Sequence, residues 1–418
     1  MRTQSTRTPE LLAPAGGLAQ LEAALRFGAD AVYLAADRFG LRQRAANFAL
    51  DDVPAAAALV HDAGAKAYVT LNALMDADDL KALPAYLEAL AAAGVDAFIV
   101  SDLGALRLAQ RYAPNVELHV STQASVCNAE AARVWHELGA SRVVCAREMS
   151  VEDIARLRAG APRELELEAF VHGAMCMAVS GRCLISAALT GRSGNKGHCT
   201  QPCRWSYALV EEQRPGEFFP VEEDVRGTYV MNAQDLNMLA HLDDLAAAGI
   251  DSFKIEGRNK KAFYVASVVR AYRLALDGVP SSELADELLA VSHRPYGTGF
   301  YYGDARQSPD VDGYTAECRH AATVEACEPA GEGAFRVIAR CYNRFCEGDE
   351  LEALSPGPHI PLLRVRNLAW LPAPDGDDSQ PKRVPVAVAN RSAERYAFET
   401  GEELAPGDFL RMRINVER

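Results

Sequence analysis

Four cysteines lie close together near the middle of the chain and carry the clearest chemical signal in the sequence. Cys176 and Cys183 are seven positions apart, Cys199 and Cys203 are four apart, and all four fall within 28 residues. Two such pairs joined by a short segment can bring four thiolates to one metal centre. Glycines between and beside them let the backbone pass close to a metal centre and present N–H groups to sulfur.

Three interpretations of this cluster are open. Zinc ribbons space their cysteine pairs by two to four residues, and the gap between Cys176 and Cys183 is wider. Iron–sulfur centres tolerate wider spacing. Four buried, reduced cysteines would behave as small apolar side chains, but the surrounding segment is polar and rich in glycine. The pattern therefore favours an iron–sulfur centre over structural zinc or simple packing.

A second group of polar side chains falls at the expected carboxyl ends of strands. In a closed barrel these ends form the mouth, where cations could hold an anionic small molecule. Each residue alone could equally be part of a structural salt bridge. The candidate catalytic residues are Arg147, His172, Lys254, Glu256 and Arg258. The other mouth residues are Arg44, Asn47, Asn72, Asp102, Ser121, Thr122, Gln123, Glu148 and Glu168, whereas His119 and Glu166 are expected inside the strands as packing.

The elements that position these residues repeat along the first 280 residues as an Ala/Leu-rich helix, a glycine and a short apolar strand. Glycine suits the left-handed residue that ends a helix before a strand. Strands alternating with helices predict a parallel sheet, and eight of them predict a TIM-like (β/α)8 barrel, with an open doubly wound sheet as the alternative. The expected strands are 10–14, 31–36, 66–72, 97–102, 116–122, 142–147, 165–171 and 252–256.

The repeat is interrupted after the seventh strand, from about 173 to 231, by the cysteine-rich insertion. We expect a hairpin there, between 205–211 and 217–222. The barrel domain is expected to span 9–305. Beyond residue 312 short alternating segments predict a small all-β, barrel-like domain to 418, with strands 321–327, 334–341, 349–353, 384–389 and 408–413, and a polar loop at 372–382.

Composition narrows the functional classes. The chain has 418 residues, 49% hydrophobic and 24% charged, with a formal net charge of −14. That charge argues against a surface covered in basic residues, but it permits a local basic groove. No run of about 18 apolar residues appears, and the first residues lack the apolar core of a signal peptide. We therefore expect no membrane partner and a cytoplasmic protein.

The segment Glu168-Ala-Phe-Val-His-Gly-Ala-Met-Cys176, with its continuation through Cys183, is the most specific motif of the chain. It resembles the signature of the collagenase-like peptidases, the thirty-second family of unassigned peptidases. The resemblance extends over about residues 9–303, and the C-terminal part is similar to that family's β-domain. The further matching segments are 41–48, 197–205, 231–236, 253–258 and 292–300.

The resemblance implies a function despite the family name. Similar members are oxygen-independent hydroxylases with a 4Fe–4S cluster that act on a quinone ring, on a ribosomal-RNA cytidine or on tRNA. A barrel plus one β-domain resembles most the members that form 5-hydroxyuridine at the tRNA wobble position and depend on prephenate. The implied partners are tRNA and a small organic acid donor. A peptidase, or a binding protein with a structural metal, is the alternative.

Residue by residue, the resemblance places the cluster ligands at Cys176, Cys183, Cys199 and Cys203. One quinone-pathway member has a ligand where this chain has Asn237, so Cys203 must complete the set here. If RNA is the substrate, cations near the site and on the β-domain are expected to contact phosphates. The candidates are Arg192, Arg204, Arg258, Lys260, Lys261, Arg294, Arg364, Arg366, Arg411 and Arg413.

Overall fold

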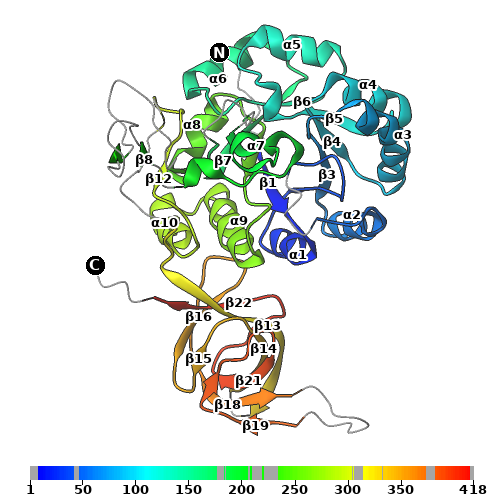
Figure 1. The fold of residues 1–418 in the computed structure, drawn as a ribbon. Coiled ribbons are helices and arrows are strands. Elements are labelled where there is room, and N and C mark those ends of the chain that lie inside the picture. Colours follow the sequence, from blue (N-terminus) through cyan, green and yellow to red (C-terminus); the bar gives the residue numbers. More distant parts are fainter. Residues whose placement is uncertain are drawn as a thin grey trace. The chain divides into compact units, whose positions relative to one another are not determined.

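The protein contains a closed parallel barrel followed by antiparallel β-structure (Figure 1). The computed structural model describes residues 8–41, 47–176, 183, 185–205, 208–209, 219–220, 234–303, 305, 314–331, 333–372 and 382–414. Within them, eight parallel strands pair in sequence from β1 to β7, and β11 then closes the ring between β7 and β1. The (β/α)8 prediction is confirmed. The barrel strands are β1 (Glu10–Ala15), β2 (Ala31–Leu34), β3 (Lys66–Leu71), β4 (Ala97–Val100), β5 (Glu117–Val120), β6 (Arg142–Val144), β7 (Glu166–Ala174) and β11 (Ser252–Ile255).

Helices connect these strands as the sequence pattern predicts. Asp76 begins α3 with a capping box. The Asp76 side chain accepts a hydrogen bond from the Asp79 backbone amide, and the Asp79 side chain accepts one from the Asp76 backbone amide. Gly28 and Gly249 end α1 and α8 with φ of 99° and 94°, the left-handed conformation expected of glycine there. The helices of this part are α1 (Leu18–Arg26), α2 (Val53–Asp62), α3 (Ala77–Ala92), α4 (Leu103–Tyr112), α5 (Ala129–Glu137), α6 (Val151–Gly160) and α8 (Leu242–Ala247).

Strand β7 runs three residues beyond its expected end because a further strand pairs with it. β10 (Asp235–Asn237) is antiparallel to residues 172–174 of β7, and β12 (Tyr296–Gly297) pairs with β10 in turn. A β-bulge also interrupts the pairing of β7 with β11, between Lys254 and Ile255. A bulge inserts one extra residue into one strand, so the alternation of side chains changes there.

The cysteine-rich insertion contains short elements. The predicted hairpin is confirmed where it is described, because β8 (Ala208–Leu209) pairs antiparallel with β9 (Phe219–Pro220). Trp205 directly follows the 3-10 turn Pro202–Arg204. The other hairpin positions lie outside the described residues, as does most of the predicted polar loop at 372–382. The other elements of the insertion are α7 (Ile185–Thr190) and the 3-10 turns Gly194–Lys196 and Pro202–Arg204.

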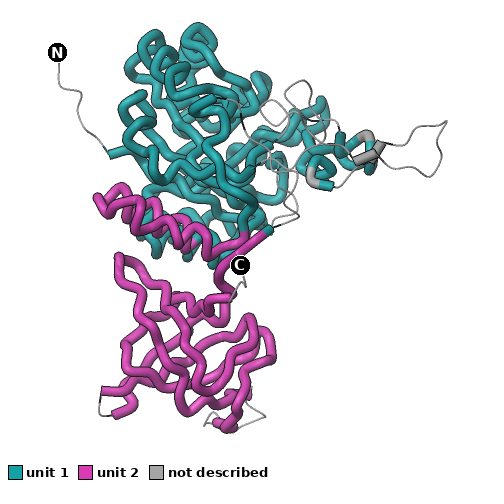
Figure 2. Tube along the Cα trace, turned by 90° about the vertical axis from the view of Figure 1, so that its left-hand side faces the viewer, with its two compact units in different colours: residues 1–265, 293–314 teal, residues 266–292, 315–418 magenta. Residues whose placement is uncertain are grey.

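The chain forms two compact units (Figure 2). The first comprises Met1–Val265 and His293–Tyr314; the second comprises Ala266–Ser292 and Thr315–Arg418. The first unit ends at Tyr314, close to the domain boundary expected at 305–312. In contrast, residues 266–292, which the sequence pattern places in the barrel domain, group with the second unit. They contain most of α9 (Ala262–Leu276) and all of α10 (Ser281–Leu289).

The second unit is all-β apart from these helices, as predicted. Its main sheet is antiparallel in the order β17-β16-β22-β13-β14-β21-β18-β19, and β15 pairs separately with β20. Its core includes Val337, Phe345, Leu351, Tyr396 and Phe398. The strands are β13 (Cys318–Gly331), β14 (Ala334–Cys341), β15 (Phe345–Cys346), β16 (Glu350–Leu354), β17 (Leu362–Arg364), β18 (Arg366–Leu371), β19 (Val384–Pro385), β20 (Val388–Ala389), β21 (Arg395–Thr400) and β22 (Phe409–Arg413).

A buried ion network joins the helices of the second unit to its sheet. Arg411 donates to both oxygens of Glu287 on α10, at 2.9 and 2.8 Å, and to Glu352 on β16 at 2.8 Å. Arg413 also bonds Glu352, at 2.6 Å. Arg411 is therefore wrongly assigned as an RNA contact, because its side chain is buried and its charge is paired. Arg413 is half-exposed, but its charge is paired too.

No helix within the described ranges combines the length and the apolar character needed to cross a membrane.

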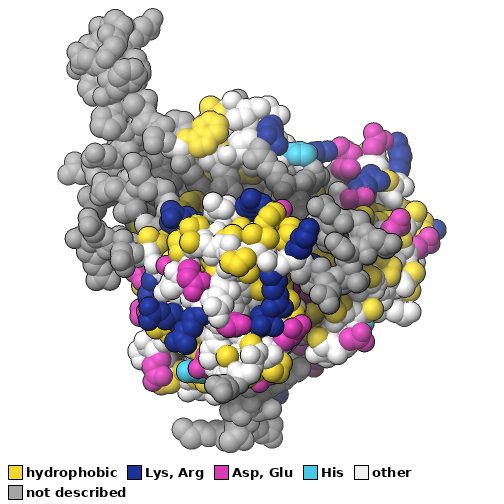
Figure 3. Space-filling model, turned by 90° about the horizontal axis from the view of Figure 1, so that it is seen from below, with side chains coloured by type: hydrophobic (Ala, Val, Ile, Leu, Met, Phe, Trp, Pro, Cys, Tyr) yellow, Lys and Arg dark blue, Asp and Glu magenta, His cyan; other side chains and the backbone are white. Residues whose placement is uncertain are grey.

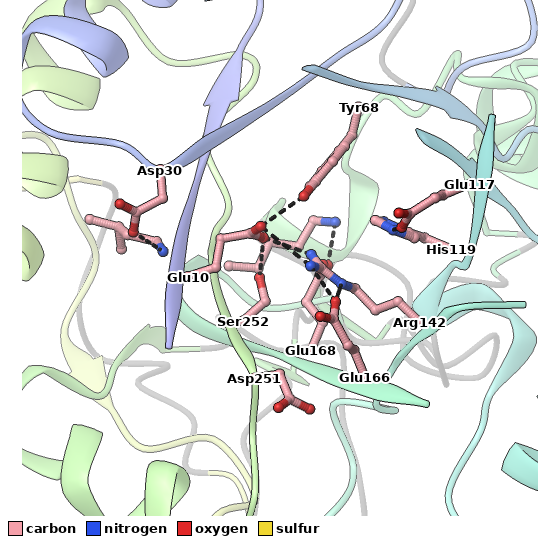
Figure 4. A network of polar contacts seen from close by, with 12 residues as sticks. Glu10, Asp30, Tyr68, Glu117, His119, Arg142, Glu166, Glu168, Asp251 and Ser252 are labelled. Atoms are coloured by element: carbon pink, nitrogen blue, oxygen red, sulfur yellow. Dashed lines mark hydrogen bonds and ion pairs between the residues drawn. The ribbon is translucent and has the colours of Figure 1, made fainter. Parts of the chain in front are cut away.

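Charged side chains fill part of the barrel interior, which is a feature the sequence pattern did not predict. Arg142 at the start of β6 donates to Glu10, Glu166 and Glu168, with shortest distances of 2.6, 2.7 and 3.1 Å (Figure 4). Glu168 accepts a 2.7 Å bond from Lys254. Tyr68 and Ser252 donate to Glu10 at 2.7 and 2.8 Å, and His119 packs edge-on against Tyr68 with ring centroids 4.7 Å apart.

Arg142 and Glu168 are 3% and 0% exposed. The charge of each is therefore removed from water and is balanced in part by the charge of the other. Burial alone would raise the pKa of Glu168, but the adjacent Lys254 and Arg142 outweigh it and hold that pKa below its usual value. The stability that Glu168 contributes is therefore present above its unfolded-state pKa of about 4.3, and it is lost as the pH falls through the lower folded-state pKa.

Replacing Arg142 with Met should lower the free energy of unfolding by about 3–5 kcal/mol, because it removes the cation paired with Glu10 and leaves Glu168 with Lys254 alone. The variant should also lose stability at a higher pH than the wild-type protein, since Glu168 then takes up a proton more readily. Urea denaturation between pH 4 and pH 8 measures both effects. Lys81→Ala, which removes an exposed pair with Asp78, is the control and should cost less than about 1 kcal/mol. Equal costs for the two variants would contradict this account.

Candidate functional site

A cavity of about 130 Å³ lies among the carboxyl-terminal ends of the barrel strands. Active sites of such barrels occur at this end. The described lining residues are Tyr33, Leu41, Thr70, Asn72, Ile99, Ser121, Thr122, Gln123, Val144, Arg147, Glu148, Phe170, Cys176, Cys183, Gly194, Cys199, Lys254, Glu256 and Arg258.

Lys254 links this cavity to the charged barrel interior. Its Nζ is 2.7 Å from Glu168 Oε1 and 4.4 Å from the centroid of the Tyr33 ring. The side chain is 5% exposed, and the charge of Lys254 is compensated by a carboxylate that lies in the interior instead of at the mouth. Lys254 is thus less available to an anion than the sequence suggested, because Glu168 already holds it.

Arg258 and Arg147 supply the other cations of the lining. Arg258 is buried and donates to Thr70 Oγ1 at 2.9 Å. Arg147 lies over Phe170, with its Cζ 3.8 Å from the ring centroid, and donates to the Ala174 carbonyl at 3.0 Å. That carbonyl is two residues before Cys176. Arg147 therefore fixes the end of β7 from which the first cysteine projects.

Glu256 is positioned by close backbone packing. Its carboxylate forms a 3.7 Å ion pair with Arg147. Gly173 has φ of 106°, and a Cβ there would overlap the Glu256 carbonyl oxygen. Only glycine permits β7 to approach the Glu256 backbone in this way. The loop after β11 is therefore held against β7, which places Glu256 and Arg147 on adjacent parts of the cavity wall.

Cys176, Cys183 and Cys199 line the same cavity. Backbone amides face two of the sulfurs: Ile185 N–H donates to Cys183 Sγ at 3.4 Å, and Gln201 N–H donates to Cys199 Sγ at 3.3 Å. Cys203 lies on the 3-10 turn Pro202–Arg204, is half-buried, and is not part of the described lining. The described structure thus brings three of the four predicted ligands to one cavity.

The segment between Cys183 and Cys199 is anchored to the loop between β3 and α3. Asn195 Oδ1 accepts from the Cys183 amide at 3.3 Å, and the Asn195 carbonyl accepts from the Leu74 amide at 2.9 Å. The next residue, Lys196, forms ion pairs with Asp76 and Asp79 at the start of α3. Adjacent residues therefore tie the cysteine segment to the barrel.

The three cysteines of the lining, with backbone amides at two of their sulfurs, are suitable ligands for a cluster of several metal ions. Cysteine thiolates with amide N–H donors at sulfur are typical of iron–sulfur sites. Within the described residues no three Cys, His, Asp or Glu side chains are gathered around one ion position. Gly194 is next to this set, since a Cβ there would lie 3.7 Å from Cys199 Sγ.

His172 does not belong to the described cavity lining, contrary to the prediction from sequence. The bulge between β7 and β11 pairs it with Ile255 instead of an inward-facing residue, so its side chain leaves the barrel interior. It is 1% exposed and lies near Tyr264 and Tyr296, with ring centroids 6.0 and 5.4 Å away. Burial lowers the pKa of His172 to about 3, so the imidazole is neutral at physiological pH.

Other residues expected at the mouth have structural roles or lie elsewhere. Asp102 caps α4 through the Ala105 amide, at 2.9 Å. Glu168 lies in the interior, and Arg44 is outside the described residues. Arg294 is buried in a 2.7 Å pair with Asp235, so it is not an exposed phosphate contact.

The lining also includes Tyr33, Thr70 and Phe170, which are not among the site residues predicted from sequence. Strand alternation could have identified Phe170, because it is two residues after the inward-facing Glu168.

Comparison with known proteins identifies the family. The family model described as peptidase family U32 matches residues 16–310. The chain is 34% identical to the tRNA hydroxylation protein P1 of Bacillus subtilis (strain 168) over 415 residues, which cover 97% of this chain and 95% of that protein.

Two further relatives carry other names. One is the 23S rRNA 5-hydroxycytidine C2501 synthase of Escherichia coli (strain K12), 38% identical over 277 residues, 66% of this chain and 40% of that protein. Another is a collagenase of Porphyromonas gingivalis (strain ATCC BAA-308 / W83), 33% identical over 312 residues, 70% of this chain and 73% of that protein. The resemblance seen in the sequence is thus confirmed: the chain belongs to peptidase family U32.

Proposed function

We propose that this protein is an RNA-modifying hydroxylase that forms 5-hydroxyuridine at the wobble position of tRNA. The main support is the cavity itself, in which Cys176, Cys183 and Cys199 adjoin Arg147 and Arg258 at the active end of a barrel. One relative, matched over 97% of this chain, is named a tRNA hydroxylation protein, and another is named for hydroxylation of an RNA pyrimidine. An RNA base reaches such an enclosed site by leaving its stack.

The proposed chemistry requires a donor and a redox centre. The C5–H bond of uracil is replaced by a C5–O bond, so the base loses two electrons, and the donor gains them as its oxygen leaves. We assign the donor to prephenate or a related organic acid, whose carboxylate needs a fixed cation in a partly dry pocket. Arg258 and Arg147 are suitably placed. Lys254 supports the site through Glu168, and Glu256 orients Arg147.

A 4Fe–4S cluster held by Cys176, Cys183, Cys199 and Cys203 would supply electron transfer and activation of the donor beside the base. The chain's own contribution is positional. Arg147 fixes the end of β7, and Asn195 and Lys196 hold the segment that carries Cys183 and Cys199. The described lining contains no histidine, so the Ser–His or Cys–His pair of a covalent peptidase is not found among these side chains.

The RNA would contact a few exposed cations near the cavity instead of a broad basic surface. On the face seen in Figure 3, the described Lys and Arg side chains gather in small groups among uncharged side chains and scattered Asp and Glu. At the active end of the barrel, Arg192 and Lys261 are exposed. Arg364 and Arg366 are exposed on the second unit, and the Arg204 side chain lies outside the described residues. We assign phosphate contacts to Arg192 and Lys261.

Cells that lack this protein should lose 5-hydroxyuridine from tRNA, and the wild-type gene should restore it. Arg258→Gln should restore it poorly, because loss of a charge-assisted hydrogen bond costs about 1.5–3 kcal/mol, or a 10- to 150-fold weaker hold on the donor. Lys382→Ala, which replaces an exposed side chain, should restore it fully. Mass spectrometry of tRNA and ribosomal-RNA nucleosides measures the result. Unchanged 5-hydroxyuridine in the deleted cells would refute the proposed function.

Protein purified without oxygen should contain about four iron and four sulfide per chain. Changing Cys176, Cys183, Cys199 or Cys203 to Ala should remove most of both, because the cluster then lacks a ligand. Cys127→Ala replaces an exposed cysteine outside this segment and should keep both. Iron, sulfide and zinc assays distinguish the outcomes, and one zinc per chain without iron would contradict the cluster assignment.

Binding of tRNA should weaken as salt rises, since phosphate contacts release counterions. Lys261→Ala and Arg192→Ala should each reduce the slope of log affinity against log salt by about 1. Lys66→Ala removes an exposed lysine at the opposite end of β3 and should leave the slope unchanged. Fluorescence titration at several salt concentrations measures these slopes. If the three variants have equal slopes, RNA does not contact the barrel through these residues.

A further inference from the structure

Two amide side chains in the cavity wall have acceptors that are buried without a partner. Asn72 Oδ1 and Gln123 Oε1 are both closed to solvent, and no described residue donates a hydrogen bond to either. Gln123 as a whole is 7% exposed. A buried polar atom left unpaired costs about 1–3 kcal/mol. Both residues line the same cavity, so a ligand bound there is a candidate partner for these two oxygens.

The surrounding hydrogen bonds fix how these amides can act. Asn72 Nδ2 donates to Ser121 Oγ at 3.4 Å, and Ser121 Oγ also accepts from the Gln123 backbone amide. The Asn72 nitrogen is thereby engaged, and its oxygen remains as an acceptor. The Gln123 terminal amide carries an acceptor oxygen and a donor nitrogen, and a half-turn about its last bond exchanges the two. The pair therefore offers acceptors and one donor.

A donor without a partner lies close by on the next strand end. Arg147 Nε is also buried with no hydrogen-bond acceptor among the described residues. The aromatic rings of Tyr33 and Phe170 belong to the same cavity lining. An enzyme that binds an unstacked base surrounds it with such groups, because aromatic rings contact its faces and polar side chains bond its Watson–Crick edge.

We infer that the amides of Asn72 and Gln123 recognise the Watson–Crick edge of a flipped pyrimidine, and that Gln123 sets the preference for uracil. This inference rests on the proposed function. The N3–H of uracil needs an acceptor, while O4 beside it needs a donor, and a single amide provides both. A carboxylate at this position offers acceptors only, which suit the N4 amino group of cytosine.

The test measures binding without requiring turnover. Full-length protein is titrated with anticodon stem–loop RNAs that differ only at the wobble base, which is uracil, 3-methyluracil or cytosine. Wild-type protein should bind the uracil RNA at least 10-fold more tightly than the 3-methyluracil RNA, which lacks the N3–H donor. Gln123→Glu should lose most of the preference for uracil over cytosine, and Gln123→Leu should bind the uracil and 3-methyluracil RNAs equally.

Asn390→Asp adds the same charge at an exposed position of the second unit and should behave as the wild-type protein. Wild-type protein could bind the three RNAs equally while cells that lack the protein have no 5-hydroxyuridine. That result would refute the role of the amides and leave the proposed function standing. If no stem–loop binds and the nucleoside profile of deleted cells is unchanged, both fail. A uracil preference that persists in Gln123→Glu and Gln123→Leu overturns the assignment of Gln123.

Discussion

The buried pair of Glu168 and Lys254 is the interaction on which the site depends. One partner belongs to the charged interior and the other to the cavity wall, so the packing of the barrel and the electrostatics of the cavity are coupled. A charge removed from water needs a close partner and full hydrogen bonding. Arg142 completes that requirement for Glu168 from β6. A change in the charge of Lys254 or Glu168 would therefore also disturb the packing of the barrel interior.

Above this base, irregular backbone features decide which side chains face the cavity. The bulge between β7 and β11 removes His172 from the interior while Phe170, Lys254 and Glu256 stay in the lining. The left-handed Gly173 then lets the loop after β11 lie against β7. A regular strand pair would have kept the alternation and placed the imidazole inward. The polarity of the cavity thus depends on one extra residue in a strand.

Much of this could be predicted from sequence because it depends on local pattern. All eight barrel strands, the left-handed Gly28 and Gly249 and the insertion after β7 follow from periodicity and glycine placement. Two kinds of feature could not. The bulge that displaces His172 leaves no mark in the apolar pattern. The pairing of Arg411 with Glu287 joins residues 124 positions apart, and nothing local distinguishes such an arginine from a solvated one.

The attachment of the cysteine segment has a consequence for how the thiols are brought together. Bringing distant points of a flexible chain together costs entropy that grows with the length of the free loop. Asn195 bonds both the Cys183 amide and the Leu74 amide, and Lys196 adds its ion pairs to Asp76. The 15 residues between Cys183 and Cys199 are therefore divided into two shorter loops fixed to the barrel. Much of the closure entropy is lost when the barrel folds, before any ligand arrives.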